Sequence, residues 1–95
     1  MKILEFECDD RYEAEKLSSL MSVQKDNTMW ISGVVATVDN EIVVQLKDWS
    51  SHSIVLKDEE TTVRLKSFVM DVIKGKRRIY SSDFVESVAR ITIDN

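Results

Sequence analysis

The 95-residue sequence contains no proline, two glycines, one cysteine and one histidine. With so little Pro and Gly, no stretch has the composition of an interdomain linker, and neither a low-complexity tract nor an internal repeat is evident. Its hydrophobic content of 43% is ordinary for a globular protein. We therefore expect a single domain over residues 1–95, near the small end of what buries a self-sufficient core.

The lone Cys8 excludes an internal disulfide, and a single thiol is typical of a reducing compartment. The sequence also lacks a long apolar run. Its first residues, MKILEFECDD, mix apolar and acidic side chains. They match neither the apolar middle of a signal peptide nor a membrane span of about 20 residues. We expect a cytoplasmic protein that does not enter a membrane.

The residue patterns of common catalytic and metal sites are absent as well. Cys8 and His52 fall on different expected elements, and together they cannot complete a closed zinc site. Asp9-Asp10 and Asp58-Glu59-Glu60 lack the spacing of a calcium loop and are better explained as helix starts. No glycine-rich phosphate-binding motif occurs. The sequence therefore predicts neither an enzyme nor a bound cofactor or metal.

The first expected elements are a strand and a helix. Lys2 to Cys8 alternates so that Leu4, Phe6 and Cys8 share one face of a strand. Asp10 is expected to cap the following helix while Glu13 reaches back to the cap, an arrangement known as a capping box. The residues that then recur at helical spacing are Ala14, Leu17, Leu20 and Met21.

A three-stranded antiparallel meander is expected next. Thr28 to Val38 is rich in β-branched residues, and Asp39-Asn40 is typical of a two-residue hairpin turn before Glu41 to Lys47. Pairing across this turn would place Ala36 and Val38 on one face with Ile42 and Val44. After the loop KDWSSH, Ile54 and Leu56 would continue that apolar surface.

The last third of the sequence is expected to form a helix and one or more strands. The helix would be capped by Asp58 and end at Gly75, with an apolar stripe made of Leu65, Phe68, Val69, Val72 and Ile73. A strand over the same residues would leave Phe68 and Val72 on the wrong face. Residues 81–90 fit either a short helix or a strand, and Ile91 to Ile93 is expected to be extended.

These elements predict an α+β fold, with the order β-α-β-β-β-α-(β or short α)-β. An antiparallel sheet, made of the central three-stranded meander plus the N- and C-terminal strands, would be packed by one or two helices. Because such a sheet has edges that must be covered, we also expect self-association as a twofold homodimer.

Charge is distributed unevenly in this acidic protein, whose net charge is −4. Residues 1–63 hold 13 acids and 6 bases, whereas residues 64–95 hold 4 acids and 7 bases. The bases that cluster, with Tyr80 nearby for stacking, are Lys74, Lys76, Arg77 and Arg78. One interpretation is that they complement the negative end of the helix dipole and cover apolar surface. The other is a contact with phosphate or with an acidic partner.

Trp49 stands in a loop otherwise made of polar residues. It either folds back as a lid over Leu46 and Ile54, or projects with His52 as an aromatic anchor of the kind enriched at interface hot spots. Trp30 differs, because packing within a strand explains it. The function these observations favour is a non-enzymatic protein-binding module that acts as a regulator or inhibitor. The alternative is a nucleic-acid-associated factor that uses residues 74–78.

Overall fold

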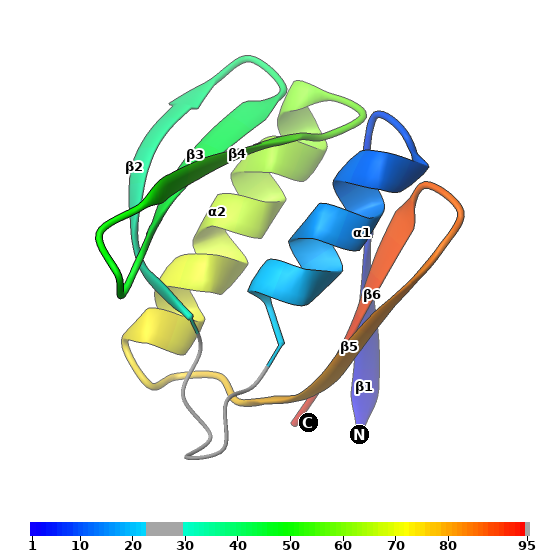
Figure 1. The fold of residues 1–95 in the computed structure, drawn as a ribbon. Helices are drawn as coiled ribbons and strands as arrows, with labels where there is room; N and C mark the ends of the chain where they lie inside the picture. Colours follow the sequence, from blue (N-terminus) through cyan, green and yellow to red (C-terminus); the bar gives the residue numbers. More distant parts are fainter. Residues whose placement is uncertain (23–29, 95) are drawn as a thin grey trace.

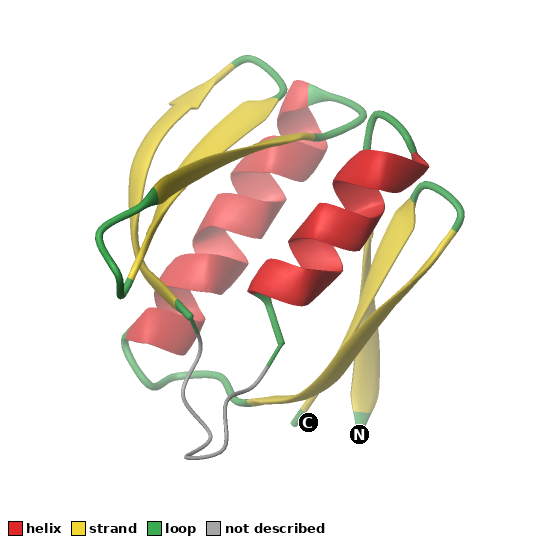
Figure 2. Ribbon diagram, in the orientation of Figure 1, coloured by secondary structure: helices red, strands yellow, loops and turns green. Residues whose placement is uncertain are grey.

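The computed structural model describes residues 1–22 and 30–94. The chain forms two helices and two antiparallel sheets, and the helices lie between the sheets (Figure 1; coloured by element type in Figure 2). One sheet has the strand order β1-β6-β5 and the other β2-β3-β4. In chain order the elements are β1 (Lys2–Glu7), α1 (Arg11–Leu20), β2 (Ile31–Val38), β3 (Glu41–Leu46), β4 (Ser51–Val55), α2 (Glu59–Ile73), β5 (Ile79–Val85) and β6 (Val88–Ile93).

The α+β class and the element order are confirmed, and β2, β3 and β4 form the expected meander. Residues 81–90, for which helix and strand were both open, form most of the β5–β6 hairpin, so the strand alternative is the correct one. The N- and C-terminal strands pair with each other in a separate sheet and do not extend the meander. The beginning of the expected strand at residues 28–29 lies outside the described residues.

The predicted face of β2 is wrong by one residue. Ala36 lies opposite Val43, and Thr37 lies opposite the buried Ile42. Because Asp39-Asn40 forms a two-residue turn, Val38 pairs with Glu41 and Ala36 pairs with Val43, so both residues lie on the face opposite to Ile42 and Val44. The two register shifts, between Ile31 and Gly33 and between Val34 and Ala36, lie farther from the turn. Ala36 and Val38 are consequently exposed, whereas Ile54 and Leu56 are buried as expected.

Both helices begin where an aspartate accepts a backbone hydrogen bond. The Glu13 N–H donates to Asp10 Oδ1 at 2.9 Å, and the Thr61 N–H donates to Asp58 Oδ1 at 2.8 Å. α2 ends before Gly75, whose φ of +80° lies in the left-handed region that favours glycine. The helix over 59–73 is thus confirmed. Leu65, Phe68 and Val69 are buried on its inner face.

Glu13 does not reach back to its own cap. Its Oε1 atom accepts a hydrogen bond from the Val55 N–H on β4 at 2.9 Å, and its Oε2 atom lies 2.9 Å from Lys16 Nζ. The helix start is therefore a simple aspartate cap. The carboxylate of Glu13 instead joins α1 to the edge of the β2-β3-β4 sheet.

The fold consists of a β-α-β-β unit that occurs twice, as β1-α1-β2-β3 and as β4-α2-β5-β6. The two units exchange parts: β1 pairs with β6 of the second unit, and β4 pairs with β3 of the first. Likewise α1 packs against β5 and β6, while α2 packs against β2 and β3. The structure thus contains an internal repeat that is not evident in the sequence.

Backbone hydrogen bonds repeat with the units. Cys8 and Leu56 form a bridge between the two sheets, so they occupy equivalent positions. Around this bridge the equivalent bonds have equal lengths: Asp9 N–H to Val55 O and Lys57 N–H to Glu7 O at 3.0 Å, and Cys8 N–H to Ser87 O and Leu56 N–H to Asn40 O at 2.7 Å. The hairpin turns of the two units also match, because Asp39 and Glu86 both have a φ of +53°.

Candidate functional site

Trp49 lies in the tight turn between β3 and β4. Its N–H donates to the Leu46 carbonyl at 3.0 Å, and the Leu46 N–H donates to the Ser50 carbonyl at 2.8 Å. Trp49 has a φ of +73°, a left-handed conformation that glycine or asparagine usually occupies. Its side chain is 82% exposed. The indole therefore projects from the turn and does not form a lid over Leu46 and Ile54.

A chain of polar contacts stabilises this turn. Asp48 Oδ1 accepts from the Ser50 hydroxyl at 2.5 Å and from the Ser50 N–H at 3.0 Å, and these bonds lower the pKa of Asp48. Ser50 Oγ also lies 3.1 Å from His52 Nε2. Since the hydroxyl proton goes to Asp48, the imidazole donates to Ser50 Oγ and does not act as its base. The contacts therefore orient His52 beside the turn, and they do not activate Ser50 as a nucleophile.

Trp30 lies at the same end of this sheet. Its carbonyl accepts from the Lys47 N–H at 3.0 Å, and its side chain is 43% exposed. The expectation that packing within a strand explains Trp30 is wrong, because β2 begins only at Ile31, which points into the core. The alternation of a strand then directs residue 30 outward. We call Trp30, Lys47 and Trp49 the indole end.

The basic segment is partly engaged by its own neighbours. Arg77 Nη1 lies 3.9 Å from Asp94 Oδ1, and the Arg78 guanidinium lies 5.7 Å from the centroid of the Tyr80 ring. Lys74 is the C-cap residue of α2, where a cation complements the helix dipole. Figure 1 places this segment, between α2 and β5, toward the same end of the molecule as the β3–β4 turn.

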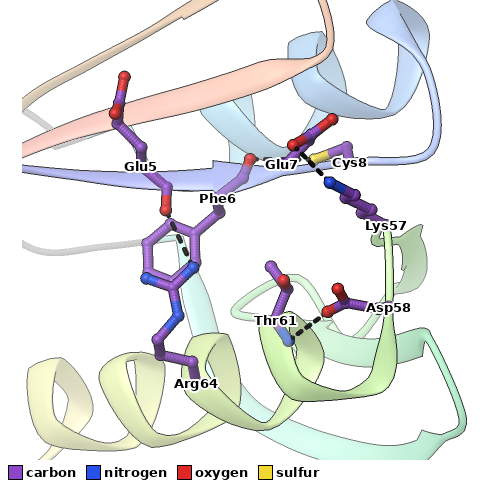
Figure 3. A network of polar contacts seen from close by, with 8 residues as sticks. All are labelled: Glu5, Phe6, Glu7, Cys8, Lys57, Asp58, Thr61 and Arg64. Atoms are coloured by element: carbon purple, nitrogen blue, oxygen red, sulfur yellow. Dashed lines mark hydrogen bonds and ion pairs between the residues drawn. The ribbon is translucent and has the colours of Figure 1, made fainter.

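A polar pocket of about 280 Å³ lies between β1 and the start of α2 (Figure 3). Arg64 crosses from α2 to β1, where its Nη2 donates to the Glu5 carbonyl at 3.2 Å and its guanidinium lies 4.9 Å from the Phe6 ring centroid. Lys57 Nζ pairs with Glu7 Oε1 at 3.3 Å. The lining residues are Glu5, Glu7, Lys57, Asp58, Thr61, Arg64 and Val88. They come from separate parts of the chain, so no local sequence pattern indicated this pocket.

Cys8 and His52 are not brought together. Cys8 is buried at the bridge between the sheets, whereas His52 lies on β4 opposite Val44. Burial, with a smaller contribution from Glu13, raises the pKa of the Cys8 thiol to about 12. The thiol is therefore neutral at physiological pH and lacks the thiolate character that a nucleophile requires.

Across residues 1–22 and 30–94, no helix combines the length and the apolar composition needed to span a membrane. Comparison with protein-family models, curated proteins and solved structures yields no match for this chain.

Proposed function

We propose that the protein is a non-enzymatic binding module that engages a protein partner, as a regulator or inhibitor, through the indole end. The observation that carries this proposal is the exposed Trp49 in a left-handed backbone conformation. Non-glycine residues in strained conformations concentrate at functional sites, where a requirement other than stability retains them. A tryptophan that is exposed and strained contributes little to folding.

The surroundings of Trp49 fit an interface anchor. Asp48 and Ser50 hold the turn, so little conformational freedom remains to be lost when a partner binds. Trp30 adds a second exposed indole at this end, and tryptophan is among the residues most enriched at interface hot spots. Self-association is the simplest form of such binding. A twofold dimer through the indole end would leave the edge strand β2 unpaired. The two register shifts in β2 make this edge irregular and so disfavour its pairing with a strand of another molecule.

Replacing Trp49 by glycine should stabilise the fold while removing the association. Glycine adopts a positive φ without strain, so we expect the free energy of unfolding to rise by about 1 kcal/mol. Loss of an aromatic hot spot should weaken partner binding by about 2 kcal/mol or more. Denaturant unfolding gives the first quantity. Light scattering, read against the 11.0 kDa monomer, and pull-down from a host lysate give the second.

The matched control is Tyr12→Ala, which removes another exposed aromatic side chain from the first turn of α1. This variant should retain the association of the parent. If Trp49→Gly and Tyr12→Ala associate alike, the indole end is not the interface. A loss of stability in Trp49→Gly would show that the indole serves the fold.

A second candidate is binding of single-stranded nucleic acid. It is favoured by the arrangement in Figure 1, where the basic segment lies toward the same end as the β3–β4 turn. Exposed aromatic rings and cations are the two components that such binding sites combine, and Tyr80 is 47% exposed. The net charge of −4 and the pairing of Arg77 with Asp94 weigh against it.

Replacing Lys74, Lys76, Arg77 and Arg78 by Gln distinguishes the two candidates. The fold should persist, because these residues follow the last turn of α2. If nucleic acid is the ligand, retention on a polyanion column should fall in the variant, and binding by the parent should weaken steeply as salt rises. A protein interface anchored by Trp49 should survive both changes. Pull-down with and without nuclease provides the independent check.

A further inference from the structure

The internal repeat allows the β1–α2 pocket to be compared with the equivalent place in the other unit. There the carboxylate of Glu13 is buried, accepts the Val55 N–H at 2.9 Å and pairs with Lys16 at 2.9 Å. In this unit, one carboxylate therefore accepts a hydrogen bond from an N–H at a strand edge and also pairs with a cation. The chain itself supplies the carboxylate.

Cys8 and Leu56 occupy equivalent positions in the two units, so residues at equal distances along the chain from Cys8 and from Leu56 correspond to each other. By this rule, each of these residues has a counterpart in the pocket. Val55 corresponds to Glu7, Lys16 to Arg64 and Glu13 to Thr61. The N–H and the cation are thus kept, but the carboxylate is replaced by a short hydroxyl side chain. Hydrogen bonding with Thr61 lowers the pKa of Asp58, and the Thr61 N–H donates to Asp58 Oδ1 at 2.8 Å.

The ladder between β1 and β6 fixes where the Glu7 N–H points. The Cys8 N–H donates to Ser87 on the β6 side, so the neighbouring Glu7 directs its N–H and carbonyl away from β6. Its carbonyl accepts from the Lys57 N–H at 3.0 Å. Glu5, two residues earlier on the same strand, accepts from Arg64 Nη2 at its carbonyl, so the Glu7 N–H faces the side on which Arg64 lies.

We propose that this pocket binds a carboxylate, offered by an aspartate or glutamate side chain of a protein partner. The carboxylate would accept from the Glu7 N–H and pair with the Arg64 guanidinium, as Glu13 does with Val55 and Lys16 in the other unit. Charge-assisted bonds of this kind are the strong class of hydrogen bond. Arg64 is already positioned by the Glu5 carbonyl and the Phe6 ring, so it need not be ordered on binding.

The other charges at the pocket restrict the ligand. Glu7 is neutralised by Lys57, and Asp58 is engaged in capping α2, whereas the exposed Glu5 adds negative charge. A partner segment with a cation beside its carboxylate therefore fits better than a polyanion. The site is distinct from the indole end, and its test does not depend on the proposed interface there.

The binding test follows the Glu7 amide by nuclear magnetic resonance during titration with sodium acetate. We expect a saturable downfield movement of this signal that sodium chloride of equal ionic strength does not produce. In Arg64→Gln the acetate affinity should fall about tenfold, the effect of removing one charge-assisted contact of about 1.4 kcal/mol. Movement that is equal in chloride, or unchanged by Arg64→Gln, would overturn the proposal.

A second test supplies the carboxylate from within. Thr61→Glu places a glutamate at the position equivalent to Glu13, so the Glu7 amide should shift downfield without ligand and the acetate response should disappear. Thr61→Gln is the uncharged control and should produce a smaller shift. If Thr61→Glu folds, as judged by its remaining amide signals, but leaves the Glu7 amide unmoved and responsive to acetate, the pocket does not accept a carboxylate in this geometry.

Discussion

Phe6→Ala is expected to cost about 3–5 kcal/mol of unfolding free energy, the usual cost of truncating a buried aromatic residue to alanine. Phe6 is 1% exposed, its ring centroid lies 5.8 Å from that of Phe68, and Arg64 covers it from the pocket side. The truncation thus leaves a cavity between β1 and α2, and it also removes the aromatic ring that the Arg64 guanidinium contacts. Because domains are stable by only about 5–15 kcal/mol, the variant should lose a large share of its stability.

Denaturant unfolding measures this loss, and Ile3→Ala is the matched control on the same strand. Ile3 is 48% exposed on the opposite face of β1, so its truncation should change stability by only about 0.5 kcal/mol. A small effect of Phe6→Ala, similar to that of Ile3→Ala, would mean that β1 is not packed as the structure shows.

Glu13→Ala is expected to cost about 1–3 kcal/mol, because it leaves the Val55 N–H without its acceptor in a partly buried place. It also removes the partner of Lys16. The bond to Val55 joins α1 to β4, which are distant in sequence, so the loss should appear as faster hydrogen exchange of the Val55 amide as well as in the unfolding free energy.

Two variants separate the bond from other effects of the substitution. Glu13→Gln keeps an oxygen acceptor and should lose less stability than Glu13→Ala. Glu15→Ala changes an exposed carboxylate of the same helix, and should be nearly neutral. If Glu13→Ala and Glu15→Ala are equally mild, the carboxylate of Glu13 does not hold α1 against β4, and the comparison with the pocket loses its basis.

Local features of the fold were predictable because neighbouring residues decide them. The alternation of Leu4, Phe6 and Cys8 defined the buried face of β1, and Asp10 and Asp58 marked the helix starts by the hydrogen bonds that their carboxylates accept. Gly75 marked the end of α2, since glycine readily adopts the positive φ found there. These features required no knowledge of which elements meet.

Parts of the candidate sites were also predictable. The sequence left open whether Trp49 folds back or projects, although a loop of Asp, Ser and His offers an indole little apolar material to pack against; in the structure Trp49 is exposed. The position of Trp30 was missed because the start of β2 determines whether it faces inward or outward. The faces of Ala36 and Val38 were also missed, because pairing across the turn places them opposite Val43 and Glu41, and pairing with β3, not composition, decides this.

By itself, the sequence determined the class of the fold and the order and ends of most elements, because short-range periodicity and capping control these properties. Only the tertiary structure decided that the strands divide into two sheets with exchanged parts, that Glu13 bonds to Val55, and that Glu7, Thr61 and Arg64 share a pocket. Those contacts join residues that are far apart in the chain. The internal repeat is visible in the equivalent backbone hydrogen bonds and burial of the two units. Cys8 and Leu56 occupy equivalent buried positions although their side chains differ in size and chemistry. The repeat therefore cannot be recognised from residue identity.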